Sequence, residues 1–148
     1  MAKKILTDKE YKYIYSRVPR LCVDIIVKTP RGIILTLRNI EPYKNFWHIP
    51  GGTVYYQETI ESATRRIARK ELGVEVDIGS LVGLIEYTSE QKLRGWGRTI
   101  SLLFFCSVKS GKLKINKEAK DTRFFKRFEK LPKNIVAEQK RFLKKILK

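Results

Sequence analysis

The chain has 148 residues, the usual size of one domain, so residues 1–148 are predicted to form a single folded unit. Hydrophobic residues make up 43% of the chain and charged residues 32%, a balance that indicates a packed core and excludes a disordered chain. There is no apolar run near the roughly 20 residues that a membrane span needs, and the first residues do not resemble a signal peptide. We therefore expect a cytoplasmic protein without a membrane span.

Positive charge is concentrated towards the end of the sequence. The net charge is +17, and residues 107–148 hold 15 Lys and Arg residues against 4 Asp and Glu residues, a local balance of +11. Such a field attracts anions such as nucleotides, nucleic acid or anionic lipid. A lysine-rich solvated surface would give the same composition, so a nucleic-acid partner is one of two interpretations of this charge.

The first part of the chain is predicted to contain a short helix followed by three strands. Thr7 and Glu10 have the spacing of a capping box, which predicts a helix over residues 8–16. Apolar and β-branched runs predict strands over residues 20–28, 33–38 and 46–50. A turn at residues 29–32 makes the first two strands a hairpin, and residues 39–45 form a polar loop.

The rest of the chain alternates helices with strands. Residues 58–72 have an apolar stripe at helical spacing, and Gly73 stands where a C-terminal cap belongs. Further strands are predicted over residues 74–87, 99–108 and 121–128, with a basic loop between the first two. An amphipathic helix over residues 134–147 follows. This order predicts a mixed α/β layered domain, with Cys22 and Cys106 as small core residues.

A glycine pair precedes the most regular helix. Gly51 and Gly52 follow a short strand, and the segment after them carries carboxylates at both ends, at Glu58 and Glu71. Glycine lets the backbone approach a ligand or an ion closely, because no Cβ intervenes. A backbone carbonyl and a helix carboxylate are hard oxygen donors, which suit Mg²⁺. The stretch therefore indicates a Mg²⁺ site that keeps water or substrate phosphates among its ligands.

This stretch resembles the Nudix box, G-x5-E-x7-R-E-U-x-E-E-x-G-U, in which U is apolar. The matching residues are Gly52, Glu58, Arg66, Glu71, Gly73 and Val74. The preceding Trp-x-Ile-Pro-Gly-Gly segment, which begins at Trp47, is also typical of that superfamily. The resemblance implies a Nudix α/β/α sandwich with a mixed β-sheet. It also implies a hydrolase of nucleoside diphosphate derivatives that depends on Mg²⁺, with Mn²⁺ as a substitute.

Two positions depart from the pattern, because Ile67 and Lys70 stand in place of glutamates. The GDP-mannose mannosyl hydrolases lose the same two carboxylates, and the strands around Asp24 and Arg38 are also similar to those of that subgroup. The chain is therefore most similar to this subgroup, which implies a nucleotide-sugar substrate and a homodimer. An inactive Nudix fold is the other interpretation of the two departures.

The resemblance implies a role for several residues. The carbonyl of Gly51 and the carboxylate of Glu71 would hold one Mg²⁺ against the diphosphate. Arg38 and Arg66 would neutralise the phosphates or the leaving group, because guanidinium groups match phosphate oxygens. Asp24 would contact the base or the ribose. Two alternatives stay open: Asp24 can be paired inside the sheet, and Arg66 can brace Glu58 or Glu71 instead.

The general base is the least determined part of this site. In the mannosyl hydrolases water attacks the sugar carbon with a histidine as base, and Lys120 stands at that position here. Thr53 and Ser101 also stand where the subgroup has Arg and Tyr. Lys120 would need a lowered pKa to act as a base, so three carboxylates are equal candidates. They are Glu118, Asp121 and Glu86.

His48 and Trp96 are the remaining candidates. His48 is the only histidine, and we expect it to be structural, because it stands at the variable position of its strand motif. Trp96 lies between Arg94 and Arg98 in a segment with two glycines, where it could stack a base while the arginines grip phosphate. A mobile hairpin tip with a packed tryptophan is the alternative interpretation.

Motif and resemblance together predict a Mg²⁺-dependent Nudix hydrolase of a nucleoside diphosphate sugar, GDP-mannose-like, that releases the nucleoside diphosphate or monophosphate. The alternative from another class is a catalytically weak Nudix fold that binds nucleotide or RNA through its basic C-terminal third. A third candidate is an enzyme that attacks phosphorus in a dinucleotide or in a capped RNA 5′ end.

Overall fold

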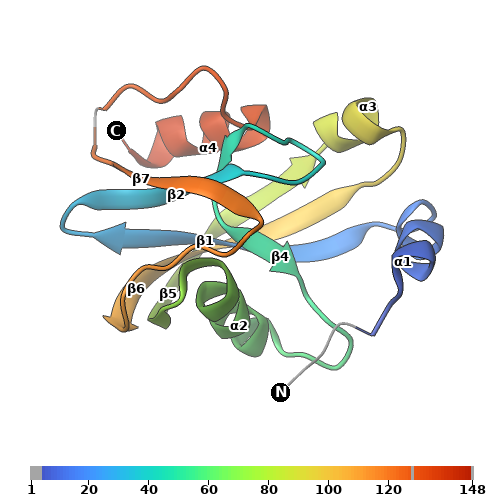
Figure 1. Ribbon diagram of the computed structural model, residues 1–148, viewed down its shortest axis with the longest axis horizontal. Coiled ribbons are helices and arrows are strands. Elements are labelled where there is room, and N and C mark those ends of the chain that lie inside the picture. Colours follow the sequence, from blue (N-terminus) through green and yellow to red (C-terminus); the bar gives the residue numbers. More distant parts are fainter. Residues whose placement is uncertain (1–4, 128, 148) are drawn as a thin grey trace.

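The computed structural model describes residues 5–127 and 129–147, which form a β-sheet between two layers of helices (Figure 1). One helix covers each face of the sheet, and each encloses its own hydrophobic core. Ile67 and Leu72 belong to the core on one face, whereas Ile135 and Leu143 belong to the core on the other. The α/β/α sandwich predicted from the sequence is confirmed.

The four helices of the described residues are α1 (Asp8–Tyr15), α2 (Ile60–Leu72), α3 (Ser89–Arg94) and α4 (Ala137–Ile146). The ends of α2 follow from local chemistry. The Thr59 hydroxyl accepts a hydrogen bond from the Ser62 amide at 3.0 Å, and this satisfies one of the unpaired donors of the first turn. Gly73 adopts a left-handed conformation with φ of 68°, which glycine tolerates and which ends the helix.

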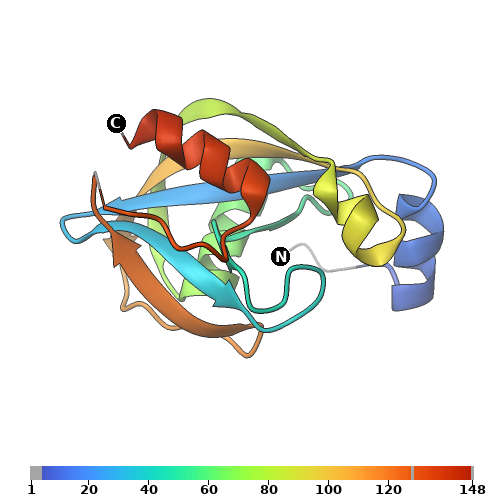
Figure 2. The same ribbon diagram turned by 90° about the horizontal axis from the view of Figure 1, so that it is seen from above.

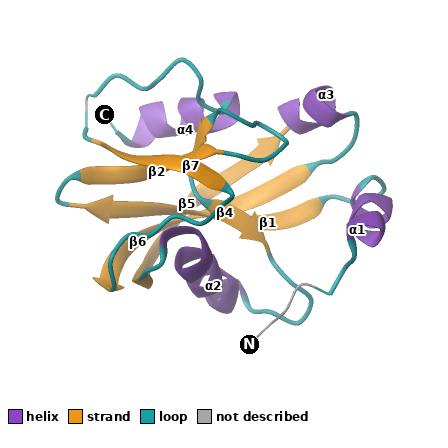
Figure 3. Ribbon diagram, viewed as in Figure 1, coloured by secondary structure: helices purple, strands orange, loops and turns teal. Residues whose placement is uncertain are grey.

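The seven strands of the described residues are β1 (Arg20–Thr29), β2 (Gly32–Arg38), β3 (Trp47–His48), β4 (Gly51–Thr53), β5 (Glu75–Tyr87), β6 (Thr99–Ser110) and β7 (Ala119–Phe125). Strand β1 is central and pairs in parallel with β6, whereas the other pairs are antiparallel, so the sheet is mixed (Figure 3). Along its other edge β1 pairs with β4 near its start and with β2 near its end. This split places Asp24 opposite Gly51.

Two predicted elements need correction. The segment between β5 and β6 is not only a loop, because it contains α3. The last helix begins at Ala137 rather than at residue 134, because the preceding backbone pairs with β3: the Trp47 amide donates to the Asn134 carbonyl at 2.7 Å, and the Val136 amide donates to the Trp47 carbonyl at 3.1 Å. The strand predicted at 121–128 is β7, and residue 128 lies outside the described residues.

Both cysteines, Cys22 and Cys106, are buried free thiols in the sheet, as predicted. Within the described part of the chain, no helix has the length and apolar character that crossing a membrane requires.

Candidate functional site

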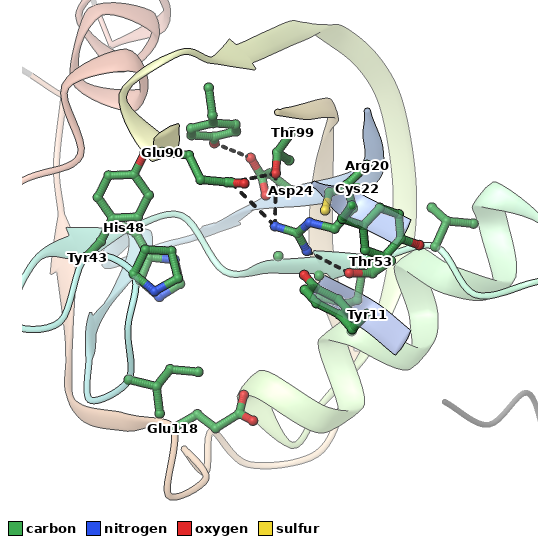
Figure 4. Close-up of a pocket in the computed structure, with 18 of the residues that line it drawn as sticks. Tyr11, Arg20, Cys22, Asp24, Tyr43, His48, Thr53, Glu90, Thr99 and Glu118 are labelled. Atoms are coloured by element: carbon green, nitrogen blue, oxygen red, sulfur yellow. Dashed lines mark hydrogen bonds and ion pairs between the residues drawn. The ribbon is translucent and has the colours of Figure 1, made fainter. Parts of the chain in front are cut away.

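A cavity of about 790 Å³ lies where α1, the last turn of α2, α3 and the ends of several strands meet (Figure 4). Among its lining residues are several that the sequence singled out: Asp24, Arg38, His48, Gly51, Arg66, Glu71, Trp96 and Glu118. Lys120 and Arg98 are not among its lining residues. The fold thus brings together side chains that are widely separated in the sequence.

One end of the cavity is acidic. Glu71 comes from the last turn of α2, and Glu118 comes from the connection between β6 and β7. Burial raises the pKa of the Glu71 carboxyl to about 7, and the nearby charge of Glu118 acts in the same direction. Lys70 lies beside them, with its Nζ 3.9 Å from Glu118 Oε1. Two carboxylates therefore share one partly buried space.

The two departures from the Nudix pattern have structural counterparts. Ile67 is 1% exposed and belongs to the core between α2 and the sheet, and it also lines the cavity, so an apolar side chain stands there in place of a carboxylate. Lys70 is exposed and faces Glu118, which comes from a different element. The acidic end thus has a second carboxylate that the helix pattern does not contain, and sequence spacing alone gave no sign of this proximity.

Asp24 lies on β1, directly opposite Gly51 of β4. Its Oδ2 accepts a hydrogen bond from the Tyr87 hydroxyl at 2.5 Å, and the Tyr87 hydroxyl accepts one from Gln139 Nε2 at 2.7 Å. Burial raises the pKa of Asp24 to about 6, whereas the Tyr87 hydrogen bond opposes that shift. Asp24 is therefore paired inside the sheet, and it also lines the cavity, so its contact with the base or the ribose stays a prediction.

Arg38 and Arg66 lie in different environments. Arg38 donates from Nε to the Pro42 carbonyl at 2.7 Å. Burial lowers the pKa of Arg38, while the negative charges of Glu71 and Glu118 raise it. The guanidinium of Arg38 therefore interacts electrostatically with the acidic end of the cavity. Arg38 and Arg66 both line the cavity, and the charges of both act on Glu71.

Arg66 instead holds the loop before α2. Its Nε donates to Glu58 Oε2 at 2.7 Å and its Nη2 donates to Glu58 Oε1 at 3.0 Å, which is a bidentate pair. Nη2 also donates to the Thr53 carbonyl at 2.6 Å, and the guanidinium lies 3.8 Å from the centroid of the Tyr55 ring. These contacts favour the bracing interpretation of Arg66 over direct phosphate binding.

His48 is enclosed by hydrogen bonds. Nδ1 lies 2.7 Å from the Ile49 carbonyl, which can only accept, so Nδ1 carries the proton and Nε2 accepts from the Thr36 hydroxyl at 3.1 Å. Burial and the charge of Arg38 lower the pKa of His48 to about 3. The ring is therefore neutral and fixed, in agreement with a structural role.

The other candidate bases and basic residues lie on the surface. Lys120 donates from Nζ to Asn45 Oδ1. Arg98 Nη1 lies 3.6 Å from Glu86 Oε2, and both side chains are about half exposed. Asp121 Oδ1 accepts from the next backbone amide. Among the candidate bases, only Glu118 lines the cavity.

The end of the cavity opposite Glu118 was missed by the sequence analysis. Arg20 donates from Nη1 to the Thr53 hydroxyl at 2.6 Å and from Nη2 to the Thr99 hydroxyl at 3.0 Å. The Thr99 hydroxyl donates to Glu90 Oε2 at 2.6 Å, and Arg94 Nη2 donates to Glu90 Oε1 at 2.9 Å. Figure 4 shows Arg20, Thr53 and Thr99 well apart from Glu118.

Aromatic side chains complete this second end. Tyr11 and Tyr15 of α1 and Trp96 after α3 line the same cavity. The sequence predicted the two elements separately, because the capping box indicates α1 and the neighbouring glycines mark the segment around Trp96. Nothing in the spacing indicated that these elements meet, which Figures 1 and 2 show at the same end of the molecule.

Comparison with known families identifies the class of protein. Residues 18–146 match the NUDIX domain, so the chain belongs to the Nudix family. The expectation of a Nudix-type hydrolase of nucleoside diphosphate derivatives is therefore confirmed at the level of the enzyme class.

Individual relatives refine this comparison. The chain is 34% identical over 125 residues to a Methanocaldococcus jannaschii protein named ADP-ribose pyrophosphatase, covering 84% of this chain and 72% of that protein. It is 39% identical over 82 residues to the Haloferax volcanii low-salt glycan biosynthesis protein Agl8, covering 55% of this chain and about half (53%) of that protein. The crystal structure of a MutT Nudix hydrolase from Burkholderia pseudomallei superposes on this structure with a TM-score of 0.78, over 88% of this chain and 99% of that chain. The two sequences are 19% identical, so this similarity shows a shared fold.

Proposed function

We propose that the chain is a divalent-metal-dependent hydrolase of a nucleoside diphosphate joined to a sugar, of the GDP-mannose or ADP-ribose kind. The observation that carries this proposal is a single cavity with Glu71, Glu118 and Arg38 at one end and aromatic and polar side chains at the other. A diphosphate suits the first end and the uncharged parts of the substrate suit the second. The M. jannaschii relative, named as an ADP-ribose pyrophosphatase, supports the same substrate class.

The acidic end fits a hard divalent cation. Among the residues that the structure describes, no group of three or more His, Cys, Asp or Glu side chains is arranged to hold a metal ion. Two carboxylates and a glycine carbonyl remain, and this sparse oxygen set suits Mg²⁺, which keeps several waters and substrate phosphates as ligands. Glu71 and the Gly51 carbonyl would hold the ion, and Mn²⁺ would serve as a substitute. When bound, the ion polarises the diphosphate and stabilises the charge of the leaving group.

The protein side chains have separate tasks in this proposal. Arg38 binds a phosphate oxygen, because it lines the cavity and, unlike Arg66, is not held in a bidentate pair with a glutamate. Glu118 takes the proton from the attacking water, because it lines the cavity whereas Lys120 does not. Arg66 positions the loop between the glycine pair and α2 by holding Glu58. Asp24, which lines the cavity, contacts the base or the ribose.

The proposal is tested first by changing Glu71. Glu71→Gln preserves the size of the side chain and removes its charge, so we expect Mg²⁺-dependent turnover to be abolished with almost no change in melting temperature. Glu61→Gln is the matched control on the same helix, since Glu61 is exposed and pairs only with Arg65 among the described residues. Full activity of Glu71→Gln would refute the assignment of the metal site.

The point of attack is decided by the products formed in ¹⁸O-labelled water from a panel of nucleotide sugars. Label on a free sugar, with unlabelled nucleoside diphosphate, means attack at carbon, as in the mannosyl hydrolases. Label on a phosphate means attack at phosphorus. The absence of turnover with every substrate would favour the second candidate function, a catalytically weak fold that binds nucleotide or RNA. The homodimer expected from the resemblance stays a prediction, tested by sedimentation.

A further inference from the structure

We propose that Tyr11 of α1 and Trp96 form the subsite for the nucleobase, at the end of the cavity away from Glu71. This inference rests on the proposed function, because it assigns one part of a nucleoside diphosphate to one part of the same cavity. It gives α1 a direct task in substrate binding, although α1 precedes the segment that matches the NUDIX domain.

The packing of α1 is unusual for a helix that serves only the fold. None of its residues is buried, although its start is fixed by a complete capping box at Thr7 and Glu10. Its aromatic side chains Tyr11 and Tyr15, one turn apart, line the cavity and contact each other edge to face with ring centroids 4.8 Å apart. A helix normally buries its apolar face against the core. Here that face borders the cavity instead.

Trp96 reaches the same place from the other side. Gly95 ends α3 in a left-handed conformation with φ of 81° and turns the chain back. The Trp96 ring then lies 6.1 Å from the Tyr11 ring at an angle of 76°. Two rings at this angle form a corner, in which a flat heterocycle stacks on one ring and meets the edge of the other. The Arg94 guanidinium lies 3.7 Å from the Trp96 centroid and holds that ring in place.

The polar groups beside this corner are fixed in position. The side chains of Arg20 and Glu90 are only 17% and 3% exposed and lie 3.8 Å apart, with the Thr99 hydroxyl bonded to both. Arg20 Nε is buried and donates to no acceptor among the described residues. These bonds hold the wall beside the two rings rigid, and the Arg20 guanidinium lies 5.7 Å from the Tyr11 centroid, so a nucleobase at the corner would meet a fixed polar surface.

The two ends of the cavity then match the two ends of a nucleoside diphosphate. Figure 4 shows Tyr11, Arg20 and Thr53 on one side of the cavity and Glu118 on another. The diphosphate would extend from the aromatic corner towards Glu71 and Arg38. Aromatic rings also stack on sugars, so the opposite orientation of the substrate is a distinct outcome of the test.

The test compares Tyr11→Ala with Tyr13→Ala by calorimetric titration. Tyr13 is on the same helix but is 63% exposed and packs on Arg17, so it is the matched control. We expect Tyr11→Ala to weaken the binding of ADP and GDP by about 5- to 150-fold, the usual size of one base–aromatic stack, and to leave the binding of inorganic pyrophosphate unchanged. Tyr13→Ala should change neither. Trp96→Leu serves as a second variant if Tyr11→Ala fails to fold.

Two results would overturn the nucleobase subsite. One is unchanged affinity for ADP and GDP in both cavity variants. The other is weaker binding of the nucleotide sugar alone, which would place the sugar at the corner. The proposed function fails separately, through the absence of turnover with any nucleotide sugar while Tyr11→Ala still weakens ADP binding. Turnover that persists with unchanged ADP affinity would remove only the subsite.

Discussion

Individual residues around the cavity show that matching a family pattern does not by itself define a role. Arg66 stands at the arginine position of the Nudix box, yet its hydrogen bonds go to Glu58 and to the Thr53 carbonyl. Glu118 lies outside the box, yet it shares the acidic end with Glu71. A helix pattern describes only residues that are neighbours on one helix, so it cannot include Glu118, which belongs to the connection before β7.

At the same scale, His48 makes folding stability depend on pH. Burial holds its pKa at about 3, below the ordinary value of 6.5, so unfolded His48 takes up a proton that folded His48 does not. Its contribution to stability is complete above pH 6.5 and decreases as the pH falls towards 3, by up to about 1.4 kcal/mol per pH unit. Urea unfolding between pH 7 and pH 4 measures the summed slope, to which Asp24 and Glu71 contribute in the opposite sense because the pKa values of both carboxyls are raised in the fold. The part due to His48 is therefore the difference from a variant that cannot titrate at this position.

The control for this prediction is His48→Gln, which cannot titrate. We expect the variant to be less stable at pH 7, because its amide cannot reproduce both hydrogen bonds of the ring. Its stability should fall less steeply than that of the wild type as the pH is lowered. Parallel slopes for the two proteins would mean that His48 does not titrate with folding.

At the scale of elements, the sequence predicted those whose signals are local. Helix α2 has a regular apolar stripe and glycine at its end, and β1 and β2 have a turn between two apolar runs. Helix α3 was missed because it has only six residues and no side-chain hydrogen bond at its N-cap. The start of α4 was misplaced because residues before it pair with Trp47, a contact distant in sequence. Trp96 was singled out from the sequence, whereas Tyr11, Tyr15 and Arg20 at the same end of the cavity were not, because they meet Trp96 only through contacts distant in sequence.

Strand β4 gives an element-scale prediction from two adjacent glycines. A Cβ at Gly51 would lie 2.0 Å from Asp24 Oδ1 and 2.7 Å from the Val23 carbonyl, so the Asp24 side chain and the β1 backbone would both have to shift. A Cβ at Gly52 would lie 3.4 Å from Ile67 Cγ1, which is an ordinary contact. Gly51→Ala should therefore destabilise the fold by about 1–3 kcal/mol, and Gly52→Ala by clearly less. Equal melting temperatures for the two variants would contradict the close packing of Asp24 on β4.

At the scale of the whole molecule, the basic C-terminal third is divided between the two faces of the sheet. The connection between β6 and β7 lies against α2, where the Lys114 amide donates to the Leu72 carbonyl at 2.8 Å. Helix α4 covers the opposite face, as Figure 2 shows, with Leu143 in the other core. The local balance of +11 is thus spread around the fold, which favours diffuse attraction of anions over one binding face.

This arrangement predicts weak and non-specific binding of single-stranded RNA. Two matched variants test it by replacing three exposed cations with Gln on each face: Arg141, Lys144 and Lys145 on α4, and Lys112, Lys114 and Lys117 before β7. Each variant should lower RNA affinity to a similar extent. The slope of log Kd against log salt concentration should fall by about 2, because three cations are replaced and each phosphate contact contributes about 0.7 to that slope. Turnover at saturating substrate should be unchanged, since none of these side chains lines the cavity. Loss of RNA binding in only one of the variants would instead define a single RNA-binding face, and it would shift the assignment towards the nucleic-acid function.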